Sequence, residues 1–144
     1  MTTTNKPNKW FWIIAILALL WNLIGVSRYL MEAYNLETFR AKFNADQLAI
    51  MDGSPAWLTA VFAIAVFSGL LACLLLLLKR KFAVTLFGIS LLFVLIQMIS
   101  GWVTTNIIEV FGTLDGVVMP MIVIIISIFL YYYSKGASQK GWLR

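Results

Sequence analysis

Hydrophobic residues in this chain are gathered into four long runs, at residues 10–30, 56–78, 82–103 and 117–133, with polar and charged residues between them. A helix that crosses the roughly 30 Å hydrocarbon core of a bilayer needs about 20 apolar residues, which is close to the length of each run. The pattern therefore predicts an all-α fold, in which residues 1–144 form one integral membrane bundle of four transmembrane helices.

The shorter polar segments predict how these helices are joined. Runs two and three are separated only by Lys79, Arg80 and Lys81, so the second and third helices are expected to form a tight antiparallel hairpin. Run four has Pro120 near its start, where a proline either completes an irregular helix start or kinks the helix. Residues 134–144 are predicted to form a short basic tail.

The longest polar segment, residues 31–54, is predicted to contain a short amphipathic helix outside the cytoplasm. After Asn35, the residues Leu36, Phe39 and Phe43 recur at spacings of three and four, which places them on one face of a helix. This apolar stripe is expected to lie either on the bilayer surface or on the bundle. The segment is interpreted either as a structured linker or as a surface that binds a partner.

A second short helix is predicted within the same segment, from residue 45 to residue 51. Asn44 and Gln47 have the spacing of a capping box at its start, and Gly53 is placed to end it. Ser54 and Pro55 then have the residue types expected at the N-cap and first position of the next transmembrane helix.

Charged residues are distributed unevenly between the two sides of the predicted membrane. All six acidic residues lie within residues 32–52 and 109–115. Eight of the eleven basic residues lie in segments that contain no acid, namely Lys6, Lys9, Lys79, Arg80, Lys81, Lys135, Lys140 and Arg144. Because cytoplasmic loops are enriched in Lys and Arg, both termini are predicted to be cytoplasmic, with the basic turn at residues 79–81 determining the topology.

Composition narrows the classes of function. The chain is 62% hydrophobic and 12% charged, and this charged fraction is about half of that in soluble domains. It contains no His and one Cys, and the four apolar runs contain no Asp or Glu. Metal sites and hydrolytic triads use these residue types, so the sequence predicts no cofactor, no metal and no enzymatic activity. The net charge of +5 lies beside the predicted helices, which indicates contact with anionic membrane lipids and not with nucleic acid.

A set of polar residues lies in the outer halves of the first and third helices: Asn22, Ser27, Arg28, Gln97 and Ser100. At 1.5 Å per residue, Asn22 lies about 18 Å along its helix and Gln97 about 22 Å along its own, so the two amides are expected at similar depth. Polar groups at this depth either bond one helix to another or line a cavity. Arg28 is expected either to extend to the membrane interface or to pair with an acid such as Glu32.

The second helix carries small residues at four-residue spacing, Ala65, Gly69 and Cys73. Such a ridge lets another helix approach closely. The spacing predicts helix packing, either within the bundle or between two copies of the chain.

Two stretches of the sequence resemble a family of small bacterial four-helix membrane proteins that is often labelled "sugar transporter". In residues 9–25 the resemblance lies in a Trp-rich start followed by Trp21, Asn22 and Gly25; in residues 55–83 it lies in Pro55, Ala56, Trp57, residues 62–67, Gly69 and the basic turn. The chain departs from this pattern at Phe82, where the family is expected to have Trp. The resemblance implies a multi-pass protein of the bacterial inner membrane, and it implies no functional residue.

Two functions are consistent with these observations. The first is a membrane protein without enzymatic activity, acting as an accessory or oligomerising subunit of a membrane assembly. The second is a transporter of a small solute, with sugars as one candidate, that works as a homo-oligomer around Asn22 and Gln97. Sugar binding would use paired amides and aromatic side chains such as Trp21 and Trp102.

Overall fold

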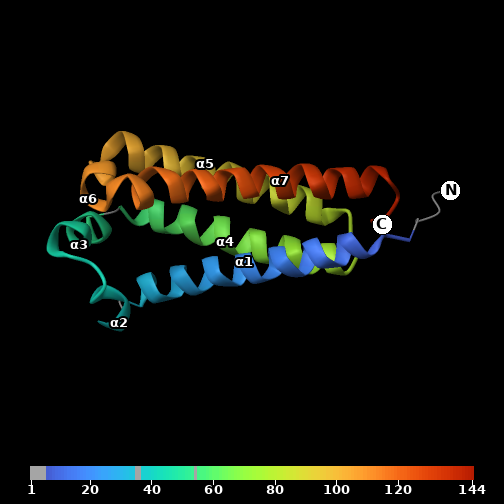
Figure 1. Ribbon diagram of the computed structural model, residues 1–144, viewed down its shortest axis with the longest axis horizontal. Helices are drawn as coiled ribbons and strands as arrows, with labels where there is room; N and C mark the ends of the chain where they lie inside the picture. Colours follow the sequence, from blue (N-terminus) through green and yellow to red (C-terminus); the bar gives the residue numbers. More distant parts are fainter. Residues whose placement is uncertain (1–5, 35–36, 54) are drawn as a thin grey trace.

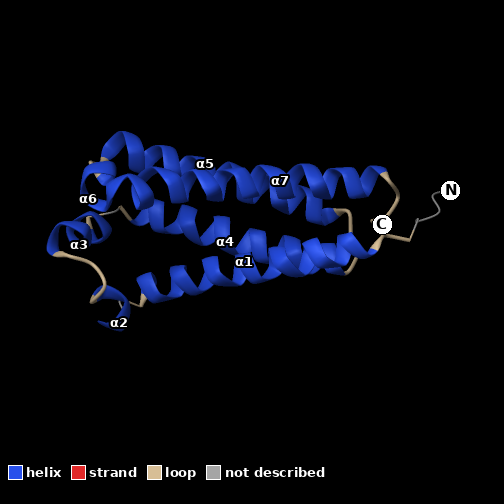
Figure 2. Ribbon diagram, in the orientation of Figure 1, coloured by secondary structure: helices blue, strands red, loops and turns tan. Residues whose placement is uncertain are grey.

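The computed structural model describes residues 6–34, 37–53 and 55–144, without the side chain of Asp115. The chain forms α1 (Lys9–Ala33), α2 (Glu37–Arg40), α3 (Ala45–Asp52), α4 (Ala56–Leu77), α5 (Phe82–Thr104), α6 (Ile107–Thr113), a π-helical turn η1 (Leu114–Val118) and α7 (Met119–Gln139). Figure 2 shows helices joined by short loops, with no strand in the described parts of the chain.

Four of these helices are long and apolar enough to cross a membrane: α1, α4, α5, and α7 together with the residues that precede it from Gly116. The predicted all-α membrane bundle of four helices is therefore confirmed. The starts and ends of α1, α4 and α5 lie within three residues of the predicted limits. Large apolar side chains on the outer faces, such as Leu17, Ile24 and Ile125, are exposed, as expected of helix faces that contact lipid.

The four long helices lie alongside one another, with α1 packed on α4, α4 on α5 and α5 on α7 (Figure 1). The start of α1 and the C-terminus lie at one end of the bundle, which we call the terminal end, and α2, α3 and α6 lie at the other, which we call the looped end. One large core cluster occupies the terminal end and joins all four long helices through residues such as Phe11, Leu76, Phe87 and Leu130.

The predicted basic tail is wrong, because α7 continues six residues beyond Tyr133 to Gln139 and the chain then turns back onto the bundle. Gly141 has a φ of 79°, and the N–H groups of Gly141 and Trp142 bond the carbonyls of Ser138 and Ala137. This is a Schellman motif, which satisfies carbonyls at the helix end and favours an apolar residue just beyond it. Polar residues 134–139 concealed this continuation from the apolar pattern.

The reversed C-terminal residues bond the turn between α4 and α5. Lys81 donates its N–H to the Arg144 carbonyl at 2.9 Å, and Arg144 donates its N–H to the Lys79 carbonyl at 2.8 Å. The preceding residues pack on the bundle: Leu143 is buried in the core cluster, and the Trp142 ring packs edge-on against the Phe11 ring, with centroids 5.8 Å apart. We call residues 79–81 and 142–144 the terminal clasp. It closes the terminal end of the bundle.

The short helices of residues 37–53 cover the looped end. The predicted capping box is confirmed: Asn44 Oδ1 accepts from the Gln47 N–H, and Gln47 Oε1 accepts from the Asn44 N–H. Gln47 also donates its side-chain amide to the Val110 carbonyl at 3.3 Å, which ties α3 to α6. Gly53 follows the end of α3, as predicted.

Of the two positions expected for the apolar stripe, the structure has the one on the bundle. Phe39 is buried, and Phe43 packs against Phe39 and Phe111 with ring centroids 5.1 and 6.0 Å away. The predictions for Asn35, Leu36 and Ser54 concern positions outside the described residues.

The entry of the chain into α7 is irregular. Gly112 has a φ of 86°, and Pro120 lies in the first turn of α7, so the proline completes an irregular helix start and does not kink a helix interior. Trp102 fixes this region by donating its indole N–H to the Gly116 carbonyl at 2.7 Å. A Cβ at Gly116 would lie 2.8 Å from the Ile108 backbone, so the close approach of η1 to α6 requires glycine.

Candidate functional site

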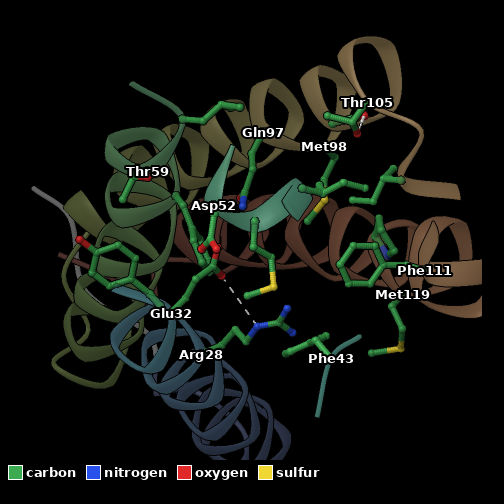
Figure 3. A pocket seen from close by; sticks show the side chains of 18 of the residues that line it. Arg28, Glu32, Phe43, Asp52, Thr59, Gln97, Met98, Thr105, Phe111 and Met119 are labelled. Carbon is green, nitrogen blue, oxygen red and sulfur yellow. Dashed lines mark hydrogen bonds and ion pairs between the residues drawn. The ribbon is translucent and has the colours of Figure 1, made fainter. Parts of the chain in front are cut away.

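A cavity of about 800 Å³ lies at the looped end of the bundle. That size is within the range of small-molecule sites. Its wall is built by all four long helices and is covered by α3, α6 and the loop between α2 and α3, as Figure 3 shows from close by. We call residues 37–53 and α6 the cover. The lining includes Arg28 and Glu32 of α1, Arg40, Lys42 and Asp52 of the cover, Phe62 of α4, Gln97, Met98, Gly101 and Trp102 of α5, Phe111 of α6, and Met119 of α7.

The cavity exists because α1 separates from α7 toward the looped end. A second core cluster beside the cavity joins Ala65 of α4, Val94 of α5 and Ile124 of α7, and no residue of α1 belongs to it in the described chain. Here α1 packs against its neighbour α4, where the Tyr29 ring meets Phe62 edge-on at 5.4 Å. The space between α1 and α7 is therefore left to the cavity and its cover.

Arg28 lines the cavity and makes the expected ion pair with Glu32. Its Nε lies 3.9 Å from a carboxylate oxygen of Glu32, and about half of its side chain is exposed. Its guanidinium also lies over the rings of Phe39 and Phe43, 5.1 and 5.7 Å from their centroids. Cations over aromatic faces are attracted by the ring quadrupole, so Arg28 holds the cover onto α1.

A second ion pair closes the cover on itself. The Nη1 and Nη2 groups of Arg40 donate hydrogen bonds to Oδ1 and Oδ2 of Asp52, with N–O distances of 2.9 Å each. These charge-assisted hydrogen bonds lower the pKa of Asp52 and raise the pKa of Arg40. The pair ties α2 to the end of α3, so the cover is one connected unit. Lys42 lies between them in sequence and lines the wall without a described ion-pair partner.

Much of the cavity lining is apolar. Three methionines contribute to it, Met51, Met98 and Met119, with Trp102 and Phe111 beside them. Gln97 extends from α5 into this space (Figure 3). Methionine side chains are flexible and polarizable and adapt to irregular apolar partners. The wall can therefore accommodate an apolar molecule and offer one amide to it.

Of the two alternatives left open for these polar residues, Asn22 has the interhelical bond and Gln97 lines the cavity. Asn22 faces α4, where its Nδ2 donates to the Ala18 carbonyl at 2.8 Å and to the Cys73 sulfur at 3.2 Å. It thus joins α1 to α4 and is not part of the cavity wall. The two amides are not at the expected equal depth: Asn22 lies level with Ser90 of α5, since both approach Gly69, and Gln97 is about 10 Å further along α5 at 1.5 Å per residue.

The remaining candidates divide between wall and exterior. Arg28 and Gln97 line the cavity. Ser27 is exposed, and Ser100 lies outside the lining with its carbonyl accepting from the Thr104 hydroxyl at 2.5 Å. Two of the five residues in the predicted polar set, Arg28 and Gln97, therefore line the cavity.

The ridge of small residues on α4 packs inside the bundle. Ala65 and Cys73 are buried, and the Ser90 hydroxyl of α5 donates to the Ala65 carbonyl at 2.8 Å. A Cβ added at Gly69 would lie 2.3 Å from Asn22 Oδ1 of α1 and 3.1 Å from Ser90 Oγ. The ridge therefore carries contacts to α1 and α5, and it is not a free surface for a second copy.

Sequence reasoning missed Lys42 and Asp52 as lining residues. The sequence signal for them was the acid-containing segment of residues 28–52. This segment holds the three basic residues that lie outside the acid-free segments, namely Arg28, Arg40 and Lys42. In the described part of the chain, no group of three or more His, Cys, Asp or Glu comes together as metal ligands do. The charged groups of the site instead form two ion pairs and one lysine, an arrangement that can bind and orient a charged amphipathic molecule.

A comparison of the chain with known protein families, curated proteins and solved structures finds no match.

Proposed function

We propose that this multi-pass membrane protein binds a small amphipathic molecule in the cavity at the looped end, without enzymatic activity, as an accessory or oligomerising subunit of a membrane assembly. The observation that carries the proposal is the contrast between the two ends of the bundle. The looped end holds a cavity of about 800 Å³, whereas the terminal end is filled by the large core cluster and the terminal clasp. A site with one open end suits binding better than passage.

The proposed orientation follows from charge. The terminal clasp, with Lys79, Arg80, Lys81 and Arg144, is basic, and the cover contains most of the acids. The excess of Lys and Arg supports a cytoplasmic terminal end and an extracytoplasmic cavity. The resemblance to small bacterial membrane proteins supports the bacterial inner membrane as the location.

A solute transporter is the second candidate, because Gln97 and Trp102 share the cavity wall. An amide and an aromatic ring are the kinds of group that hold a sugar. Transport would also require the terminal end to open, which means separating the two backbone hydrogen bonds of the clasp and exposing Leu143. A homo-oligomer remains part of this second proposal, with an interface other than the Ala65 ridge.

The experiment is native mass spectrometry of the protein extracted gently from its own membrane, compared with Gly101→Phe. Gly101 lines the cavity, and a Cβ added there would meet only Ile107 Cδ1 within 4 Å, at 3.9 Å, so a side chain can be added at this position without a clash at its first atom. Gly136→Ala, on α7 with nothing within 4 Å of its added Cβ, is the matched control.

We expect wild type and Gly136→Ala to carry a noncovalent small molecule that Gly101→Phe lacks. A stoichiometric complex with other chains would support the accessory role and count against a self-sufficient transporter. The binding proposal would be refuted if Gly101→Phe carried the same small molecules at the same occupancy as wild type.

A further inference from the structure

We infer that the molecule bound in the cavity is a membrane lipid or related amphiphile with an apolar chain and an anionic headgroup, which Lys42 recognises. This inference rests on the proposed binding function and names the chemical class of its ligand. Three features of the described cavity support it: the charges of its lining, the apolar side chains of its lining, and the absence of a described core side chain that joins α1 to α7 at the looped end.

The charges of the cavity leave one excess cation. The lining contains three basic groups, Arg28, Arg40 and Lys42, and two acids, Glu32 and Asp52. Glu32 pairs with Arg28, and Asp52 pairs with Arg40. Lys42 is exposed, and the described residues supply no ion-pair partner for it. An ammonium group at the mouth of a partly apolar site favours a ligand with one compensating negative charge.

The apolar part of the cavity lining favours hydrocarbon over a polyhydroxylated solute. Three methionines, Phe62 and Trp102 line it. The neutral polar side chains are few, and one of them, Thr105, already donates its hydroxyl to the Gly101 carbonyl at 2.5 Å. A sugar would leave hydroxyl groups unpaired against these apolar side chains, which is unfavourable. An acyl chain meets no such penalty.

The position of the cavity gives a lipid access to it. The cavity lies at one end of the membrane-spanning helices, the level at which lipid headgroups meet water. In this half of the bundle no described core side chain joins α1 to α7. An acyl chain can therefore enter from the bilayer along the seam between α1 and α7 while its headgroup stays beside Lys42 under the cover.

The test is a titration, followed by native mass spectrometry, of the full-length protein with lysophosphatidylglycerol and with a monoacylglycerol of the same acyl chain. The variants are Lys42→Gln, Gly101→Phe and, as a control for loss of a lysine elsewhere, Lys135→Gln at an exposed position near the terminal end. A parallel titration includes inorganic phosphate as the competitor.

We expect wild type and Lys135→Gln to bind the anionic lipid about tenfold more tightly than the neutral one, the effect of about 1.4 kcal/mol for one charge-assisted contact. Lys42→Gln should bind both lipids equally, and Gly101→Phe should bind neither. Inorganic phosphate should not displace the lipid, because the acyl chain supplies most of the contact.

Other outcomes separate failure of this inference from failure of the proposed function. Equal affinity of wild type for the two lipids, or displacement by inorganic phosphate alone, would overturn the ligand class while leaving a binding cavity. Unchanged binding of both lipids by Gly101→Phe would overturn the ligand class and the cavity as the binding site together.

Discussion

Gly69 of α4 lies close to side chains of both α1 and α5, and its replacement by alanine tests the packing of the bundle. The added Cβ would lie 2.3 Å from Asn22 Oδ1 and 3.1 Å from Ser90 Oγ. The first distance is about 1 Å shorter than an ordinary contact, so Asn22 must move. It cannot move freely, because its amide nitrogen is bonded to Ala18 and Cys73.

The size of the effect follows from two opposing contributions. Insertion of a methyl group into a packed contact costs about 1–3 kcal/mol. Replacement of a helical glycine by alanine contributes about 0.5–1 kcal/mol in the stabilising direction. We therefore expect Gly69→Ala to lower the free energy of unfolding by about 1–2 kcal/mol.

The assay is reversible unfolding in mixed dodecyl maltoside and sodium dodecyl sulfate micelles, followed by circular dichroism. Gly136→Ala is the control for helix propensity, because its Cβ meets nothing within 4 Å, and it should be as stable as wild type or more stable. The double variant Asn22→Ala/Gly69→Ala removes the clash and should be more stable than the sum of the two single changes indicates.

Two results would refute this account of the packing. Wild-type stability of Gly69→Ala would mean that Asn22 Oδ1 does not lie within 2.3 Å of the position of the added Cβ. Strict additivity in the double variant would mean that Asn22 is not the group displaced.

Three further predictions concern the cover and the terminal clasp. Because the hydrogen bonds from Arg40 lower the pKa of Asp52, the pair stabilises the cover above the ordinary carboxyl pKa and ceases to do so as the pH falls through the lowered value. The protection of residues 37–52 from hydrogen exchange, relative to the intrinsic rate at each pH, should fall over that range in wild type. In Asp52→Asn this protection should be low at every pH. Lys79 has a φ of 58°, a region that costs a residue with a side chain about 1–2 kcal/mol, so Lys79→Gly should raise the thermal unfolding temperature; a lower temperature would show that the lysine side chain matters more than the backbone. Leu143 is 1% exposed, so Leu143→Ala should cost about 2–3 kcal/mol of stability, whereas Leu114→Ala, at a 65% exposed position, should cost little by the same micelle unfolding assay.

The four long helices were predictable because their signal is local. A run of about 20 apolar residues has few stable alternatives in a bilayer, since every backbone polar group must bond within its own segment. The tight turn at residues 79–81 and the capping box at Asn44 and Gln47 are also local, and both are present. The same reasoning failed after Tyr133, because helix continuation there depends on burial of Ser134 and Ala137 against other helices.

The candidate site was less predictable, because it depends on rotation of helices about their own axes. Asn22 and Gln97 were expected at similar depth, but Asn22 lies level with Ser90 of α5 and faces α4, whereas Gln97 lies about 10 Å further along α5 and faces the cavity. Periodicity identifies a face only where polar and apolar residues differ clearly, and α1 is apolar all round. The contacts that hold the cover on α1 were not predictable for a different reason. They join Arg28 to Phe39 and Phe43, which are distant from it in the sequence, and no local pattern marks them.

The central claim, that the looped end holds a cavity reached from outside while the terminal half is closed, is tested most directly by thiol accessibility. Wild type supplies the closed reference, because its single cysteine, Cys73, is fully buried. In proteoliposomes treated with a water-soluble maleimide, Gln97→Cys should gain a rapidly modified thiol, and the further change Gly101→Phe should slow its modification. Wild type should stay unmodified. A cysteine at position 97 that reacted as slowly as Cys73 would contradict the account.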